Sequence, residues 1–267
     1  MYQTQHSDQY KSRIAKQFSR AATQYDSLAE VQSDIAHDAM ALLPIKCGTL
    51  LDIGCGTGRI SRQISARSER VIAMDLALGM LQHASTLDDD RAVTWLQGDA
   101  ECLALADNTV DTVFSSMALQ WCISPQQVIA EISRILKPQG QAVLAIMCAG
   151  SFTELEQVWA QLDTQRHINQ FHSADQWQQA ARQSGLQLSL TTQCYQTWHA
   201  DFRSLLASIK GIGANVLMKQ QASQPSSTPP NFSRSTFAKL ESHYLSLSDD
   251  NKRLPLSYQI VLLHCVK

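Results

Sequence analysis

The sequence predicts an α/β protein built on a doubly wound, Rossmann-like sheet, and three observations indicate this fold. Short apolar strands alternate with helical segments between residues 46 and 150. A glycine-rich turn follows the first of these strands, and an acidic residue stands at or just beyond the end of each of the next two. Alternation at this spacing is typical of parallel strands joined by right-handed crossovers, whose carboxyl ends meet along one ligand-binding edge.

The first half of the chain predicts an N-terminal helical arm followed by the core of the sheet. Residues 8–43 carry apolar side chains at helical spacings, and Pro44 and Gly48 close this arm. Ser124 and Pro125 suit the N-cap and first position of a helix that runs to Leu136, and a turn is expected at 137–140. The other expected elements are strands at 49–53, 71–75, 92–96, 110–115 and 141–147, and helices at 60–66 and 78–85.

The second half of the chain is less regular. Its pattern predicts strands at 186–195 and 256–266, helices at 154–163, 173–184 and 235–247, a helix from 201 that ends within 210–214, and a Ser/Pro-rich loop at 220–230. The helices between the last two strands have no place in the sheet, so we expect them to form a cap over its binding edge. The expected organisation is an arm at 1–45, a core at 46–150, the rest of the core at 151–200, a helical cap at 201–250 that contacts substrate or carrier, and a final strand at 251–267.

Composition excludes several classes of function. A formal net charge of -2 provides no overall positive field for nucleic acid, and no apolar run is long enough to span a membrane. The N-terminal residues lack a secretory signal. The seven cysteines show no CxxC pair and no metal-ligand spacing, which indicates free thiols in the cytoplasm and predicts no metal site.

The glycine-rich turn is the first functional signal. Gly54, Gly56 and Gly58 have the spacing GxGxG, whereas dinucleotide sites carry GxGxxG. Asp52 lies two positions before this turn, where a carboxylate can order the loop and help to receive an amino-acid ammonium group. The turn therefore favours a ligand that carries an amino acid over a pyrophosphate.

Residues at the ends of the second and third predicted strands suit the rest of such a ligand. Asp75 ends the second strand about 20 residues beyond the turn, where a carboxylate can accept both hydroxyls of a ribose. Asp99 can accept the amino group of an adenine, Ala100 can offer the ring a backbone N–H, and Met80 can pack on its face. The candidate cofactor-binding residues are Asp52, Gly54, Cys55, Gly56, Gly58, Asp75, Leu76, Met80, Asp99, Ala100, Met117 and Gln120.

Together these motifs resemble those of the class I S-adenosylmethionine-dependent methyltransferases. The matching stretches are LLDIGCGTG, VIAMDLALGML, LQGDAECLAL, FSSMALQW and LKPQGQAVLAI, within residues 49–147. The resemblance implies that S-adenosylmethionine is the cofactor. It also implies a seven-stranded sheet whose last strand is antiparallel.

Segments outside this core resemble the malonyl-[acyl-carrier protein] O-methyltransferases of biotin synthesis. They are residues 18–26, 119–122, 254–258 and, most distinctively, SIKGIGA at 208–214. The chain departs from that family at Ile209, where leucine is frequent, and in a longer, Ser/Pro-rich stretch at 220–231. The resemblance implies methyl transfer to the free carboxylate of a malonyl thioester, whose ester then primes pimeloyl formation. The carrier, acyl carrier protein or coenzyme A, stays open.

A carboxylate acceptor is already ionised near pH 7, so this reaction needs no general base. It does need groups that orient the carboxylate. Lys210, Arg203 and Tyr25 are the candidate catalytic residues, with Tyr25 as a hydroxyl donor on a lid. An acidic carrier protein would also need a basic docking patch, for which the sequence offers Arg203, Lys210, Lys219, Arg234, Lys239 and Arg253.

Three other interpretations remain at this point. The chain could be a class I methyltransferase for a small molecule such as a quinone or sterol precursor. Ring methylation would favour an acidic or histidine base near the acceptor, and residues 119–122 contain none. A non-catalytic S-adenosylmethionine-binding protein is less consistent with the complete set of glycines and carboxylates. An NAD-dependent oxidoreductase is disfavoured by the glycine spacing.

Overall fold

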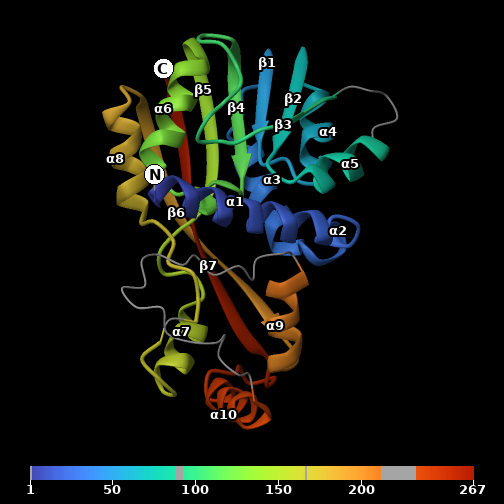
Figure 1. The fold of residues 1–267 in the computed structure, drawn as a ribbon, viewed down its shortest axis with the longest axis vertical. Coiled ribbons are helices and arrows are strands. Elements are labelled where there is room, and N and C mark those ends of the chain that lie inside the picture. Colours follow the sequence, from blue (N-terminus) through green and yellow to red (C-terminus); the bar gives the residue numbers. More distant parts are fainter. Residues whose placement is uncertain (1, 88–92, 166, 212–232) are drawn as a thin grey trace.

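A seven-stranded sheet forms the centre of the computed structural model, which describes residues 2–87, 93–165, 167–211 and 233–267 (Figure 1). The strand order is β3-β2-β1-β4-β5-β7-β6. The strands are β1 (Thr49–Ile53), β2 (Arg70–Asp75), β3 (Val93–Gln97), β4 (Val110–Ser116), β5 (Leu136–Met147), β6 (Gln187–His199) and β7 (Leu254–Val266). β7 runs antiparallel to both β5 and β6, while β1 to β5 pair in parallel. The expected doubly wound, seven-stranded sheet with an antiparallel last strand is confirmed.

Helices surround this sheet, and several begin at caps that the sequence encodes. Ser124 accepts a hydrogen bond from the Gln127 amide at the start of α6, and Ser173 and Gln176 form a reciprocal capping box on α8. The described helices are α1 (Tyr2–Ala21), α2 (Tyr25–Leu28), α3 (Glu30–Met40), α4 (Arg59–Ser65), α5 (Leu78–Thr86), α6 (Pro125–Ile135), α7 (Thr153–Ala160), α8 (Ala174–Gln183), α9 (Phe202–Gly211) and α10 (Arg234–Leu245), with a short 3₁₀ turn at Leu119–Trp121. None of the described helices is long and apolar enough to cross a bilayer.

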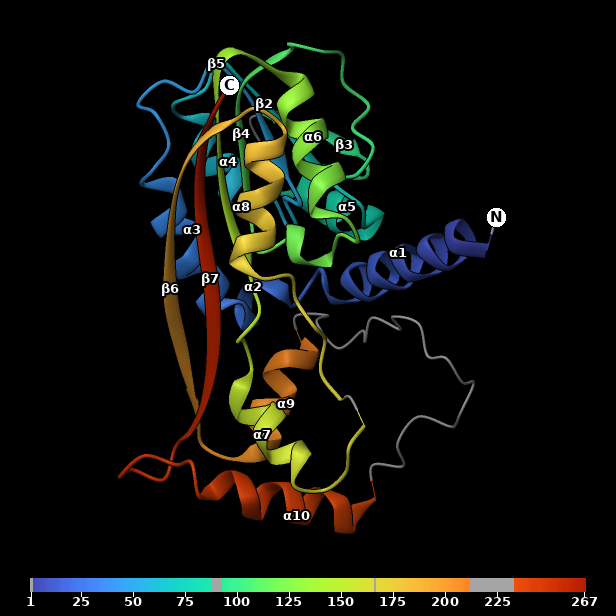
Figure 2. The same ribbon diagram turned by 90° about the vertical axis from the view of Figure 1, so that its left-hand side faces the viewer.

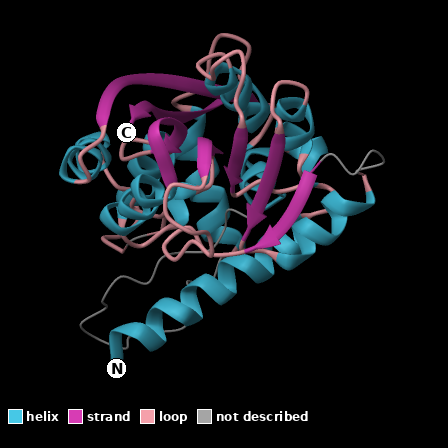
Figure 3. Cartoon of the chain, turned by 90° about the horizontal axis from the view of Figure 1, so that it is seen from above, coloured by secondary structure: helices cyan, strands magenta, loops and turns pink. Residues whose placement is uncertain are grey.

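The sheet buries both faces, as its nearly continuous apolar strands require. Alternate residues of one strand enter different cores: Leu50 packs with the cluster that includes α3 and α4, and Leu51 packs with the cluster that includes α6 and α8. The strand order reverses between β1 and β4. Ligands of open α/β sheets bind at such a reversal, beyond the carboxyl ends of the strands. Seen from above, α1 runs across these strand ends (Figure 3).

The last two strands extend beyond the carboxyl edge of the sheet. β5 pairs with β7 only as far as Met147 opposite Ile260, whereas β6 continues to pair with β7 as far as His199 opposite Leu254. The outer halves of β6 and β7 therefore form a two-stranded ribbon. Helices α7, α9 and α10 pack around it in a lobe below the sheet, which we call the lower lobe (Figures 1 and 2).

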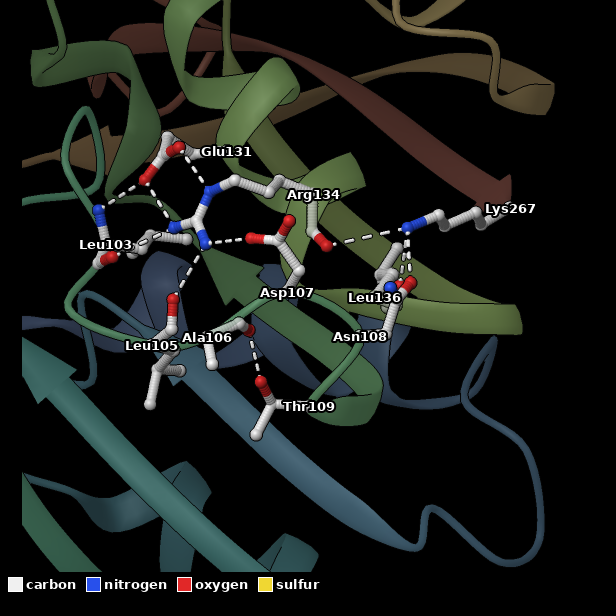
Figure 4. A network of polar contacts seen from close by, with 10 residues as sticks. All are labelled: Leu103, Leu105, Ala106, Asp107, Asn108, Thr109, Glu131, Arg134, Leu136 and Lys267. Atoms are coloured by element: carbon white, nitrogen blue, oxygen red, sulfur yellow. Dashed lines mark hydrogen bonds and ion pairs between the residues drawn. The ribbon is translucent and has the colours of Figure 1, made fainter.

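The opposite, amino edge of the sheet is held by a polar network (Figure 4). The Arg134 guanidinium donates to Glu131, to Asp107 and to the carbonyls of Leu103 and Leu105. Lys267, at the end of β7, donates to Asn108 and to the carbonyl of Leu136. This network fixes the connection that leads into β4 and stays clear of the ligand edge.

Three expected elements differ from the structure. The arm at 8–43 is not one helical unit, because it breaks after Ala21 and again at the buried Ala29 into α1, α2 and α3. The turn at 137–140 lies inside β5, because Leu136 already pairs with Val110 and the intervening residues loop out before Gln141 resumes the pairing. β6 continues to His199 because β7 supplies a partner that far. Lys219, the 212–214 part of SIKGIGA and the Ser/Pro-rich loop lie outside the described residues.

Candidate active site

The glycine turn between β1 and α4 adopts a conformation that suits glycine. Gly54, Gly56 and Gly58 have φ of 74°, 55° and 70°, in the left-handed region that L side chains rarely adopt. A Cβ at Gly54 would lie 2.1 Å from the Cβ of Ala118, and one at Gly58 would lie 2.2 Å from the Trp95 ring. A Cβ at Gly56 would meet nothing within 4 Å. Two of the glycines thus allow close packing, and the third faces open space.

Asp75 ties this turn to the end of β2. One carboxylate oxygen accepts the Gly56 amide at 2.9 Å, and the other accepts the Ala77 amide at 2.7 Å. Burial raises the pKa of Asp75, although these backbone donors oppose the rise. Each oxygen keeps a lone pair for a further donor. The carboxylate is therefore positioned to receive hydroxyls of a ligand.

Asp52 lies deeper, on β1, with only 2% of its surface exposed. Its carboxylate accepts the Ser61 hydroxyl at 2.6 Å. Burial raises the pKa of Asp52 to about 7, and the negative charge of Asp75 adds to the rise. A cationic group of a ligand placed beside it would favour its ionised form.

Two adjoining cavities open around these carboxylates. The strand-end cavity encloses about 790 Å³ including its open mouth. Tyr25 and eight of the predicted cofactor residues line it: Gly54, Gly56, Asp75, Leu76, Met80, Asp99, Ala100 and Met117. Of these eight, Gly54, Gly56 and Met117 also border the neighbouring cavity.

The neighbouring glycine-turn cavity encloses about 480 Å³ and contains the more polar part of the site. Asp52 and Cys55 line it, and Tyr25 stands where the two cavities meet. Three polar atoms in its wall are buried without a hydrogen-bond partner: Gln32 Oε1, Arg59 Nε and Ser116 Oγ. Because buried polar atoms normally have partners, these three indicate a place for a polar ligand.

The N-terminal arm closes the strand-end cavity from the outside. Lys11, Ile14 and Phe18, on one side of α1, line the cavity. Lys11 forms ion pairs with Asp99 at 2.7 Å and with Glu101 at 2.6 Å. Burial opposes the positive charge of Lys11, but the two carboxylates outweigh it and raise its pKa. The arm is thus fixed to the end of β3, beside the predicted adenine site.

Tyr25 is held over the glycine turn by its neighbour in α2. Asp26 accepts the hydroxyl of Thr57, a buried residue of the turn, at 2.7 Å. Burial raises the pKa of Tyr25 well above its usual value, and the charges of Asp75 and Asp26 act in the same direction. The phenol therefore stays protonated and can donate a hydrogen bond at neutral pH.

Four predicted site residues lie outside both cavities. Gly58 packs against Trp95, and the buried Gln120 donates to the carbonyl of Met117, whose φ is 55°. Lys210 is exposed at the end of α9, where the preceding Ile209 packs near Tyr25 and Trp121. Arg203 lies at the other end of α9, with its guanidinium over the Phe237 ring at 5.7 Å. The structure thus brings Lys210 closer than Arg203 to the elements that surround the cavities.

Sequence reasoning missed several residues of these walls. Lys11 reaches Asp99 across 88 positions of the chain, and no local pattern announces such a contact. Gln32 stands in a helix whose periodicity predicts only packing. Arg59 does offer a signal, because it is the first residue of the helix that follows the glycine turn.

We expect Asp52 to make the stability of the protein depend on pH. Its carboxyl ionises near pH 4 in the unfolded chain and near pH 7 in the folded one, so the stability it contributes falls as the pH rises from about 4 to about 7. Asp52→Asn removes this titration. Between pH 5 and pH 8, urea unfolding should show the free energy of unfolding of the wild type falling relative to that of the variant by on the order of 2 kcal/mol.

Asp8→Asn, which removes an exposed carboxyl on α1, is the matched control for the loss of one carboxylate charge. Parallel profiles for the wild type and Asp52→Asn would mean that Asp52 ionises near its ordinary value.

The chain is similar in sequence to known methyltransferases. Residues 51–144 match the family model described as "Methyltransferase domain". The chain is 37% identical over 255 residues to the malonyl-[acyl-carrier protein] O-methyltransferase of Pectobacterium atrosepticum, covering 94% of this chain and 94% of that protein. It is 36% identical over 215 residues to the biotin biosynthesis bifunctional protein BioHC of Cellvibrio japonicus, covering 79% of this chain but only 43% of that protein, so it spans less than half the length of that relative.

Among solved structures, the YcgJ protein of Bacillus subtilis is similar with a TM-score of 0.61 and 18% sequence identity, covering 86% of this chain and 98% of that one. This similarity concerns the fold alone.

Proposed function

The chain belongs to the malonyl-[acyl-carrier protein] O-methyltransferase family, and from this premise we propose that it transfers a methyl group from S-adenosylmethionine to the free carboxylate of malonyl-acyl carrier protein in biotin synthesis. The observation that carries the proposal is the alignment with the Pectobacterium relative, which extends through the N-terminal arm and the lower lobe as well as the core. A methyltransferase for a quinone or sterol precursor is not favoured, since these outer segments match the malonyl family.

The two cavities fit the methyl donor. A sulfonium nucleoside with an amino-acid tail needs partners for two ribose hydroxyls, an ammonium, a carboxylate and an adenine. Asp75 would receive the hydroxyls, and Asp99 with Ala100 would hold the adenine beside Met80. Asp52 would attract the ammonium, and Arg59, with its unpartnered Nε, would pair with the carboxylate. The open space before Gly56 leaves room for the chain between them.

Bound there, S-adenosylmethionine would supply an electrophilic methyl group on a positively charged sulfur. The protein itself needs to move no proton, because the acceptor carboxylate is ionised at neutral pH. Burial raises the pKa of Tyr25 and of Cys122, so both stay protonated near pH 7. Asp52, whose pKa is raised to about 7, is assigned to the ammonium group of the methyl donor and not to the acceptor. Catalysis then depends on bringing two reactants together in the right orientation, which can lower a barrier by several kcal/mol.

Aromatic side chains help to exclude water from the strand-end cavity, which Phe18 and Trp121 line. Trp121 packs edge-on against Phe18 at 5.8 Å between ring centroids and against Phe171 at 6.2 Å. Ile209 of α9 packs with Tyr25 and Trp121 around the buried Ala29. Because the reaction neutralises two opposite charges, a dry site favours it.

For the acceptor carboxylate we propose Tyr25 as a hydroxyl donor and Lys210 as the nearer cation. Tyr25 is supported by its place between the cavities and Lys210 by the packing of its neighbour Ile209. Arg203 has less support, because it is engaged with Phe237. We further propose acyl carrier protein as the carrier and the cytoplasm as the compartment. All seven cysteines are free, as a reducing compartment would keep them.

The test is methyl transfer by the purified protein. With labelled S-adenosylmethionine, malonyl-acyl carrier protein should gain one methyl group by mass, while acetyl-acyl carrier protein, which lacks the free carboxylate, should gain none. A parallel reaction with malonyl-coenzyme A tests the carrier. Methylation of both the acetyl and malonyl forms, or of neither, would refute the proposal.

A further inference from the structure

Three basic residues follow the outer side of α1. Arg13, Lys16 and Arg20 are exposed and are spaced three and four positions apart, so they form one stripe, which we call the α1 basic face. Lys11, Ile14 and Phe18, which line the strand-end cavity, lie on the opposite side of the same helix. The helix is therefore a wall with one face toward the cavity and a positively charged face toward solvent.

The charges of the α1 basic face are uncompensated. In the part of the chain that the structure describes, none of the three cations has a carboxylate within ion-pair distance. Lys11 provides the contrast, because its ammonium is held by Asp99 and Glu101. Within residues 7–21 Asp8 is the single acidic residue. Such a field attracts an anionic partner and orients it during approach.

The position of this face suits a partner that must deliver a substrate. α1 crosses the carboxyl ends of the strands and projects from the body of the molecule (Figures 2 and 3). A partner on its outer side would be separated from the strand-end cavity by this helix alone, since the inner side of α1 lines the cavity. A carrier protein holds its thioester at the end of a flexible group that contains a phosphodiester. A short path from the docking surface to the cavity therefore favours delivery of the thioester, and a positive surface favours the phosphodiester.

We propose that the α1 basic face docks the acidic surface of acyl carrier protein. The proposal rests on the proposed function, because that function supplies the carrier. It assigns to the arm a second role besides closing the cavity: the inner side contacts the methyl donor's site, and the outer side recognises the carrier.

Four of the six basic residues that the sequence suggested for docking are placed less favourably. Arg253 pairs with Asp249 and lies over the Trp198 ring at 5.3 Å. Arg203 lies over Phe237, and Arg234 and Lys239 stand on α10, at the far end of the lower lobe from α1 (Figure 1). A carrier docked there would have to reach the cavities along the whole length of the lobe.

Two charge variants and two substrates test the proposal. One variant replaces Arg13, Lys16 and Arg20 together by glutamine, which removes their charge while keeping helix propensity. The other variant replaces the same three residues together by glutamate. The matched control replaces three exposed cations of the lower lobe, Arg234, Lys239 and Lys252, by glutamine. For each protein, kcat/KM is measured with malonyl-acyl carrier protein and with malonyl-pantetheine, which has no carrier. Fluorescence anisotropy with labelled holo-acyl carrier protein measures docking independently of catalysis.

The glutamine variant should lose about tenfold in kcat/KM with malonyl-acyl carrier protein at low ionic strength, with a weaker dependence on salt, and the glutamate variant should lose more. With malonyl-pantetheine both should stay within about twofold of the wild type, and the lower-lobe control should keep its activity with both substrates. Carrier affinity by anisotropy should fall in parallel.

Equal losses with both substrates would overturn the proposal, because they would mean a damaged arm. Unchanged carrier affinity, or a loss confined to the lower-lobe control, would overturn it as well. If the wild type binds the carrier through this face and yet methylates neither malonyl substrate, the docking surface stands and the proposed function fails.

Discussion

Asp75→Ala should weaken the binding of S-adenosylhomocysteine by at least about 100-fold, because each hydrogen bond from a ribose hydroxyl to this carboxylate contributes roughly 1.5–3 kcal/mol. The carboxylate also accepts the amides of Gly56 and Ala77, so its removal loosens the turn against which the ligand lies. Both effects act in the same direction. Isothermal titration calorimetry with S-adenosylhomocysteine measures the loss without any need for an acceptor substrate.

Asp111→Ala is the matched control for this experiment. Asp111 also accepts a backbone amide, that of Thr49 at 2.9 Å, but it lies near the start of β4, beside the amino end of β1, and forms an ion pair with Lys137. We expect its removal to leave ligand affinity unchanged. An affinity of Asp75→Ala within about threefold of the wild type would mean that Asp75 only orders the turn, since two charge-assisted hydrogen bonds are worth far more.

Gly54→Ala should be the most destabilising single-methyl substitution in the glycine turn. The new Cβ would overlap that of Ala118 at 2.1 Å, and the residue would be held at a φ of 74°. The left-handed conformation costs about 1–2 kcal/mol, and overpacking adds typically 1–3 kcal/mol. Urea unfolding should therefore give a loss of several kcal/mol, accompanied by loss of ligand binding as the turn shifts.

Two variants separate the clash from the conformational strain. Gly185→Ala has nearly the same φ, 76°, with nothing within 4 Å of the added Cβ, so it should show only the conformational cost. Gly54→Ala combined with Ala118→Gly removes the overlapping Cβ and leaves the Cα of residue 118 at 3.6 Å, so it should restore the part of the stability that the overlap cost and keep the conformational cost. Equal losses for Gly54→Ala and Gly185→Ala would show that the neighbouring chain yields to the methyl group.

Much of the fold could be predicted because its signals are local. The limits of β1 were predicted to the residue, and those of α6 nearly so, since alternation of apolar residues and a Ser-Pro cap depend only on adjacent positions. The family resemblance added the antiparallel last strand. The break of the arm at Ala29 could not be predicted from periodicity, because contacts with the rest of the protein override it.

The residues of the candidate site also fall into a group that the sequence predicted and a group that it did not. The glycines and the aspartates at strand ends stand at fixed offsets from strands, so the sequence by itself determined that Gly54, Asp75 and Asp99 would gather at one edge of a parallel sheet. Only the tertiary structure decided that Lys11 is fixed to Asp99, that Arg59 and Gln32 have unpartnered atoms in a shared wall, and which side of α1 faces solvent. The physical reason is the distance along the chain over which each feature is determined. Strand formation and turn geometry depend on neighbouring residues, whereas side-chain contacts between distant segments depend on how whole elements pack.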